Sequence, residues 1–146
     1  MGKVLAFYAK TLILYIIFEK GGAANMAVDD GIDVVASKKN VFYHIQVKTA
    51  NERADAKYHF SIKRNAFARK IEANTHYVFV MRRMISKRRV NDFLILPQSV
   101  LSLFDKNGLL KGKDTISLNI SFQGSDRFFL NSSEEVTEYV NNWSTL

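Results

Sequence analysis

The chain contains no cysteine and only one proline, Pro97, among its 146 residues. Without cysteine, neither a disulfide framework nor a thiolate metal site can form, and a reducing compartment, the cytoplasm, is the expected location. Acidic residues are also scarce relative to basic ones, 14 against 21, which leaves a formal net charge of +7. This surplus favours anionic partners, and nucleic acid is the first candidate.

The sequence also lacks an apolar run that fits a membrane span. Residues 4–18 form its most apolar stretch, but they fall short of the about 20 residues that a spanning helix needs, and Lys10 interrupts them. A signal peptide is an alternative, because Lys3 precedes the stretch, although no small-x-small cleavage site follows it. We favour a core helix that is covered on most sides and ends before Gly21-Gly22.

Two runs rich in β-branched and aromatic residues, 31–36 and 41–49, flank the polar segment 37–40. They predict an antiparallel hairpin in which Ser37 pairs with Asn40 across the turn.

In that register, Asp33 lies directly opposite His44 and diagonal to Gln46. Because side chains alternate along a strand, Lys48 shares this face with Gln46. A carboxylate, an amide oxygen and an ammonium would then converge, which suits a divalent cation beside a phosphate. The plain alternative is a polar face that only contacts water.

Asp33, followed after the hairpin by Gln46-Val47-Lys48, resembles the motif of the PD-(D/E)XK nuclease superfamily. In that motif an acid opens one core strand and an acid-x-lysine lies on the next. The chain is most similar to the resolvase-like and restriction-endonuclease-like branch, which includes archaeal Holliday-junction resolvases. It departs from the pattern at Gln46, where glutamate is usual, and it has no acid at the start of the first helix.

The resemblance implies an α/β protein with a restriction-endonuclease-like core of order α-β-β-β-α-β. Its mixed central sheet is flanked by helices and followed by C-terminal strands and a final helix. It covers about residues 2–83 of a single domain over 1–146, with a C-terminal extension at about 90–146. The implied function is a Mg²⁺- or Mn²⁺-dependent DNA endonuclease that works as a homodimer on duplex or branched DNA. A catalytically inactive nucleic-acid-binding module on the same fold is the alternative.

The resemblance also assigns roles within the motif. Asp33 would bind the ion, together with the side-chain carbonyl of Gln46 and the backbone carbonyl of Val47. Lys48 would orient the attacking water or neutralise the charge that develops on the phosphate.

Glutamine at position 46 removes one negative charge from this ligand set, which weakens cation binding unless another acid compensates. Glu19, Asp29 and Asp30 are the candidates for that acid. In the plainer interpretation Glu19 only ends the first helix, and the two aspartates cap a turn.

Basic residues gather between positions 63 and 89, where Glu72 is the single acid. They are denser than solubility requires, although a solubilising surface is the plain alternative. The predicted nucleic-acid contacts are Lys63, Arg64, Arg69, Lys70, Arg82, Arg83, Lys87, Arg88 and Arg89. We expect the segment 82–89 to be a charged loop between two strands.

The rest of the pattern predicts the elements that complete the domain. They are strands at 23–28, 58–62, 76–81 and 92–96, helices at 63–73 and 99–104, a hairpin of 115–122 with 127–130, and a final helix at 133–143.

Overall fold

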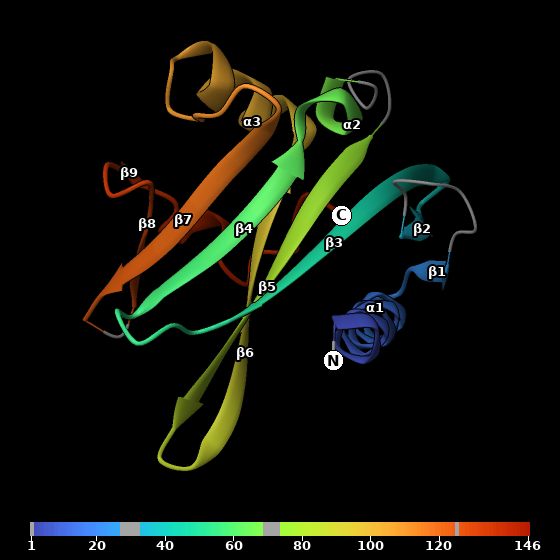
Figure 1. Cartoon of the computed structure of the whole chain (residues 1–146). Helices are drawn as coiled ribbons and strands as arrows, with labels where there is room; N and C mark the ends of the chain where they lie inside the picture. Colours follow the sequence, from blue (N-terminus) through green and yellow to red (C-terminus); the bar gives the residue numbers. More distant parts are fainter. Residues whose placement is uncertain (1, 27–32, 69–73, 125) are drawn as a thin grey trace.

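A mixed sheet of five strands, in the order β1-β2-β3-β5-β6, forms the centre of the fold (Figure 1). The structure is a computed structural model that describes residues 2–26, 33–68, 74–124 and 126–146. Neighbouring strands are antiparallel except for β3 and β5, which run parallel. The strands are β1 (Ala23–Met26), β2 (Val34–Lys38), β3 (Val41–Asn51), β5 (Thr75–Ile85) and β6 (Arg88–Pro97). The predicted mixed central sheet is therefore confirmed.

A second sheet, in the order β4-β7-β8-β9, packs on one face of the first. Tyr77 and Phe79 of the central sheet are buried between the sheets together with Phe60 and Leu118. The strands are β4 (Lys57–Lys63), β7 (Thr115–Gln123), β8 (Arg127–Leu130) and β9 (Glu134–Glu135). The predicted hairpin of 115–122 with 127–130 is confirmed as β7 and β8.

Helix α1 (Gly2–Glu19) packs on the opposite face of the central sheet. It buries Ala9, Ile13 and Ile17, whereas several large apolar side chains on its outer side are exposed. The predicted core helix is confirmed, but the expectation that most of its sides are covered is wrong, because the sheet supplies only one surface. No helix among the described residues is long and apolar enough to cross a membrane.

Two shorter helices lie near the connections between the sheets, α2 (Arg64–Ala68) and α3 (Gln98–Lys106). α3 follows Pro97 directly and confirms the short helix predicted there. The predicted helix 63–73 is described only as far as Ala68, so its later part, with Arg69 and Lys70, lies outside the described residues.

The turn between β2 and β3 lies one residue later than predicted. Lys39 and Asn40 both have positive φ, 51° and 66°, so they form a two-residue turn and Lys38 pairs with Val41. Turns of this kind match the right-handed twist of the flanking strands, and asparagine tolerates the left-handed conformation. The predicted pairing of Ser37 with Asn40 is therefore wrong, because Ser37 pairs with Phe42, two residues further along β3.

The segment 82–89 is not the predicted loop. Strands β5 and β6 continue through it and pair up to Ile85 and Arg88, with a two-residue turn at Ser86 and Lys87, whose φ values are 49° and 66°. Figure 1 shows this end of the hairpin extending beyond the other elements. We call residues 82–91 the β5–β6 arm.

The C-terminal segment does not form the predicted helix over 133–143. Apart from β9, it contains only a 3₁₀ turn, η1 (Thr137–Tyr139). Val136 is fully buried and its N–H donates to the carbonyl of Phe128, while Val140 forms a bridge with Leu94. Pairing with existing strands satisfies backbone groups that a helix would have used internally, and β-branched residues are weak helix formers.

Burial of His76 makes the fold sensitive to acid. His76 is 6% exposed and its ring packs edge-on against Tyr43 at 5.3 Å between centroids. Burial lowers the pKa of His76 below its ordinary value of 6.5, so the unfolded chain binds a proton more readily. The stability that this neutral imidazole contributes is present above pH 6.5 and is lost as pH falls through the lowered pKa.

We therefore expect the free energy of unfolding to decline when pH falls from about 7.5 to about 5, and to decline less in His76→Gln. Urea unfolding followed by circular dichroism measures both. His59→Gln, which changes an exposed histidine on β4, is the control and keeps the decline of the unmodified chain. An identical pH dependence in all three proteins would refute the assignment.

Candidate active site

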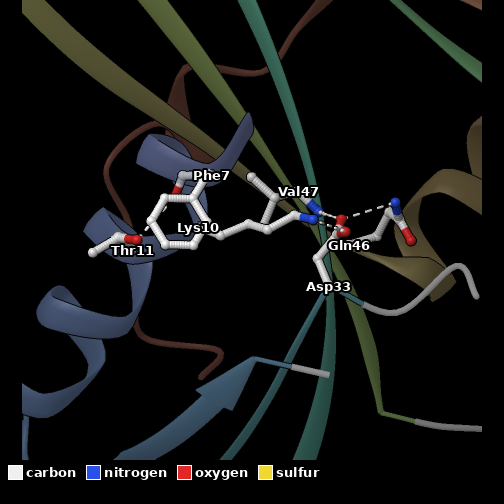
Figure 2. Close-up of polar contacts among 6 residues, drawn as sticks. All are labelled: Phe7, Lys10, Thr11, Asp33, Gln46 and Val47. Carbon is white, nitrogen blue, oxygen red and sulfur yellow. Dashed lines mark hydrogen bonds and ion pairs between the residues drawn. The ribbon is translucent and has the colours of Figure 1, made fainter. Parts of the chain in front are cut away.

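Asp33 lies immediately before β2, next to the part of β3 that extends past the end of β2. Its backbone N–H donates to the carbonyl of Ile45, and its side chain turns back toward β3. Oδ2 accepts a hydrogen bond from the N–H of Val47 at 2.8 Å and another from Nε2 of Gln46 at 2.9 Å (Figure 2). The side-chain carboxylate of Asp33 thus accepts the hydrogen bond from Val47 N–H that a backbone carbonyl of a longer β2 would accept, and it holds the segment before β2 against β3.

The hairpin register explains this pairing. Val34 pairs with Ile45, so the next position outward puts Asp33 opposite Gln46, and His44 lies opposite Val35 instead. The predicted neighbour of Asp33 was His44, and that prediction is wrong. A shift by two residues keeps every side chain on its face of the sheet, so Asp33 and Gln46 still meet.

Lys10 of α1 completes the surroundings of Asp33. Its Nζ lies 2.9 Å from Oδ1, and the side chains of Lys10 and Asp33 are 29% and 15% exposed. Figure 2 shows the ammonium reaching the carboxylate from the side opposite Gln46. Sequence reasoning treated Lys10 only as an interruption of the apolar stretch. The available signal was a charged residue on a helix that is otherwise apolar, which needs a partner.

Gln46 and Lys48 lie two residues apart on β3, so they share one face of the sheet. Both line a hollow of about 220 Å³ with Ser61, Ile62, Lys63, Ala66 and Tyr77, which come from β4, α2 and β5. Burial raises the pKa of the Tyr77 phenol to about 12, so this wall of the hollow stays neutral. We call this space the β3 hollow.

The structure therefore brings Asp33, Gln46 and Lys48 near one another, with Gln46 in the middle. Asp33 binds Gln46 directly, and Gln46 shares the β3 hollow with Lys48. Lys48 and Lys63 contribute two ammonium groups to the β3 hollow, which favours an anion such as a phosphate there, while Lys10 pairs with Asp33 from the side of α1.

The acids proposed to support Asp33 are placed differently. Glu19 accepts a hydrogen bond from the hydroxyl of Tyr15 at 2.7 Å and lies nine residues beyond Lys10, about 13 Å further along the helix. It is not brought to Asp33. Asp29 and Asp30 lie outside the described residues, and the described part of the chain holds no group of three His, Cys, Asp or Glu that could bind a metal.

A divalent ion at this site would need the carboxylate of Asp33. Asp33 already binds a cation, the ammonium of Lys10, so a metal ion would have to replace Lys10 there. The further oxygen donors predicted from the sequence are the side-chain carbonyl of Gln46 and the backbone carbonyl of Val47. In the structure Gln46 presents its nitrogen to Asp33, so its amide would have to turn to offer the oxygen.

The predicted basic contacts differ in what they bind within the protein. Arg83 forms an ion pair with Asp92 at 3.1 Å and lies over the ring of Phe122, and both charged side chains are almost buried. Arg64 forms an ion pair with Asp105 at 2.7 Å. These two arginines stabilise the fold, and the prediction that they contact nucleic acid has no support from their positions.

The cations of the β5–β6 arm are more available. Lys87, Arg88 and Arg89 are exposed, and Arg82 and Arg89 line a groove of about 420 Å³ together with Arg53. Burial, and after it the repulsion from Arg89, lowers the pKa of Arg82 from its ordinary value of 12.5. Clustered positive charge of this kind attracts phosphate groups.

Comparison with known proteins agrees with this architecture. No protein-family model and no curated protein matches the sequence. Among solved structures, the chain is similar to Hjc, a Holliday junction resolvase from the hyperthermophilic archaeon Archaeoglobus fulgidus, at 13% identity and a TM-score of 0.51, over 77% of this chain and 81% of that one. It is also similar to the bacterial homing endonuclease I-Ssp6803I, at 12% identity and a TM-score of 0.62, over 98% of this chain and 90% of that one.

The chain has the restriction-endonuclease-like fold. The resemblance drawn from Asp33 and Gln46-Val47-Lys48 is therefore confirmed at the level of the fold. At such low identity the similarity does not extend to individual side chains, and the chemistry has to be argued from the site itself.

Lys10 provides a direct test of cation binding at Asp33. Lys10→Met removes the ammonium and keeps an apolar stem on α1. We expect Mn²⁺ to bind roughly two- to fivefold more tightly in a calorimetric titration, because a partly exposed ion pair is worth up to about 1 kcal/mol. Lys106→Met, which removes an exposed lysine of α3, is the charge-matched control and leaves the affinity unchanged. Equal affinities in the two variants would show that Lys10 does not compete with the ion.

Proposed function

We propose that the chain is a divalent-metal-dependent endonuclease that hydrolyses phosphodiester bonds of DNA, with Asp33, Gln46 and Lys48 as its catalytic residues. The observation that carries this proposal is the contact between Asp33, immediately before β2, and Gln46 of β3, which lines the β3 hollow together with Lys48. The nuclease names of the two structural neighbours support the reaction class by analogy of fold.

In this proposal each side chain has a separate task. Asp33, the side-chain carbonyl of Gln46 and the backbone carbonyl of Val47 would hold Mg²⁺ or Mn²⁺, with Asp30 as a candidate for a second carboxylate. The bound ion would supply Lewis acidity and lower the pKa of a water molecule. Lys48 binds the phosphate in the β3 hollow and stabilises the negative charge that grows on its oxygens.

The β5–β6 arm supplies the DNA contacts in this proposal. Arg88 pairs with Ile85, which lies six residues beyond Phe79, the β5 residue opposite Lys48. This is about 20 Å along a strand on the same face as Lys48, comparable to six base pairs of duplex. Alternation places Arg82 and Arg89 on one face of the arm and Arg88 on the other. A two-stranded ribbon with cations on both faces can lie in the major groove and contact both phosphate backbones.

A catalytically inactive DNA-binding module is the second candidate, and one observation favours it. Lys10 occupies the cation position at Asp33, so the carboxylate is neutralised without any metal ion. On this view the β3 hollow and the β5–β6 arm still bind phosphates, but no hydrolysis follows. A cytoplasmic location stays a prediction under either candidate.

Lys48 distinguishes the two candidates. In Lys48→Ala we expect Mg²⁺- or Mn²⁺-dependent cleavage of duplex and branched DNA to fall about 10²- to 10³-fold, since a group that stabilises developing charge is removed. DNA binding in Ca²⁺ should change by no more than a few-fold. Lys113→Ala, at an exposed position outside the site, is the control and retains both activities. Salt-sensitive binding by the unmodified chain without any cleavage would reject the enzyme in favour of the module.

The salt dependence of DNA binding gives an independent test of the β5–β6 arm. Replacing Lys87, Arg88 and Arg89 together by alanine should weaken duplex binding and reduce the slope of log affinity against log salt by about 0.9 for each phosphate that the variant no longer neutralises. Fluorescence anisotropy between about 50 and 200 mM salt measures the slope. Arg127→Ala is the control, because Arg127 is engaged with Glu135 on the second sheet. An unchanged slope in the triple variant would place the DNA elsewhere.

A further inference from the structure

The outer side of α1 presents a row of large apolar side chains to solvent. Val4, Phe7, Tyr15 and Phe18 are 77%, 63%, 60% and 56% exposed. Their spacing of three or four residues, with Thr11 in the middle, places them on one stripe of the helix. Figure 1 shows α1 at the edge of the molecule with the sheet on one side only. We call these five residues the α1 stripe.

The positions of the α1 stripe are symmetric about Thr11. Val4 and Phe18 are equally distant from Thr11, and so are Phe7 and Tyr15. Two α1 helices that cross antiparallel at Thr11 would therefore bring Val4 of each copy to Phe18 of the other, and Phe7 to Tyr15. A two-fold symmetric interface requires this relation, in which one residue contacts a second and the second contacts the first.

Charges at the ends of the helix fit the same arrangement. Lys3 and Glu19 are also equally distant from Thr11, so the antiparallel crossing places each ammonium beside a carboxylate of the other copy. A parallel pairing would instead bring like charges together. The charge pattern thus selects one orientation.

The polar atoms within the α1 stripe already have partners. The hydroxyl of Thr11 donates to the carbonyl of Phe7 at 2.9 Å, and that of Tyr15 donates to Glu19 at 2.7 Å. Their burial in an interface would leave no hydroxyl unpaired, which removes the usual cost of burying polar groups. Tyr8 is excluded from the stripe because its ring lies under Arg82 and its hydroxyl accepts from Asn91.

The area of the α1 stripe is sufficient for a modest dimer. Aromatic side chains bury roughly 150–250 Å² each, so about 500 Å² per copy and about 1,000 Å² in total are available at the observed exposures. This total is near the lower limit for specific interfaces, about 1,200 Å², and predicts micromolar rather than nanomolar association.

We propose that the α1 stripe binds the α1 stripe of a second copy of this chain, in an antiparallel two-fold arrangement centred on Thr11. The interface does not depend on the proposed nuclease function, because the stripe shares no residue with the β3 hollow or the β5–β6 arm. The inner side of each α1 remains packed on its own sheet.

Charge exchange tests the pairing. Lys3→Glu and Glu19→Lys each place like charges together in the antiparallel dimer, and each should raise the dissociation constant about three- to tenfold. The double variant Lys3→Glu/Glu19→Lys should bind more tightly than either single variant, although it lacks the Glu19 acceptor of the Tyr15 hydroxyl. Each single change places the favourable charge at its end of the helix dipole, so α1 itself should stay folded. Sedimentation velocity without DNA, at up to about 200 µM protein, measures the association.

Phe7→Glu tests the apolar contacts of the α1 stripe. This variant should be a monomer at every protein concentration measured, with the far-ultraviolet circular dichroism of the unmodified chain. A monomeric unmodified chain at the highest concentration would overturn the proposal. So would a dimer that persists in Phe7→Glu, or a double variant that associates no better than the single ones. Because no DNA is present, these outcomes do not bear on the nuclease assignment.

Discussion

The carboxylate of Asp33 holds three elements together. It accepts from the backbone of Val47 and the amide of Gln46 on β3, and it pairs with Lys10 of α1. A carboxylate that is only 15% exposed is costly without partners, and these three donors offset the cost. Their arrangement fixes where β2 begins, aims Gln46 toward the β3 hollow and fastens α1 to the sheet. The position of the candidate site is thus a consequence of how this one charge is satisfied.

The same contacts separate what the fold provides from what the chemistry requires. The two similar structures share the chain's architecture at 12% and 13% identity, which leaves the charges in the site free to differ. Here an ammonium comes from the first helix, and an amide stands at position 46. Both changes reduce the negative charge available to a divalent ion, and both leave the backbone geometry around Asp33 intact. The restriction-endonuclease-like fold is therefore compatible with a reduced negative charge around Asp33.

The sequence predicted the features that depend on local pattern. β-branched runs located the hairpin and the buried strands, and Asp33 meets Gln46 even though the turn was assigned wrongly, because a two-residue shift preserves the faces. Lys10 was missed because its partner lies on another element, and no local pattern reports such a contact. The final helix failed for a related reason. The acids at 134 and 135 resemble a helix start, but strand β8 pairs with them, and tertiary pairing overrides weak local propensity.

Helix α1 has two sides with different surroundings. Its inner side delivers Lys10 to Asp33, and its outer side bears the α1 stripe. Lys10 directly precedes Thr11, the centre of the proposed crossing, so both Lys10–Asp33 pairs would flank the two-fold axis. The two-fold symmetry would then make the two Asp33 sites equivalent, and the two sites would face in opposite directions along a DNA molecule bound across both. Since a two-fold symmetric protein matches a two-fold symmetric site on a duplex, the two proposals together imply a palindromic or symmetrically branched substrate.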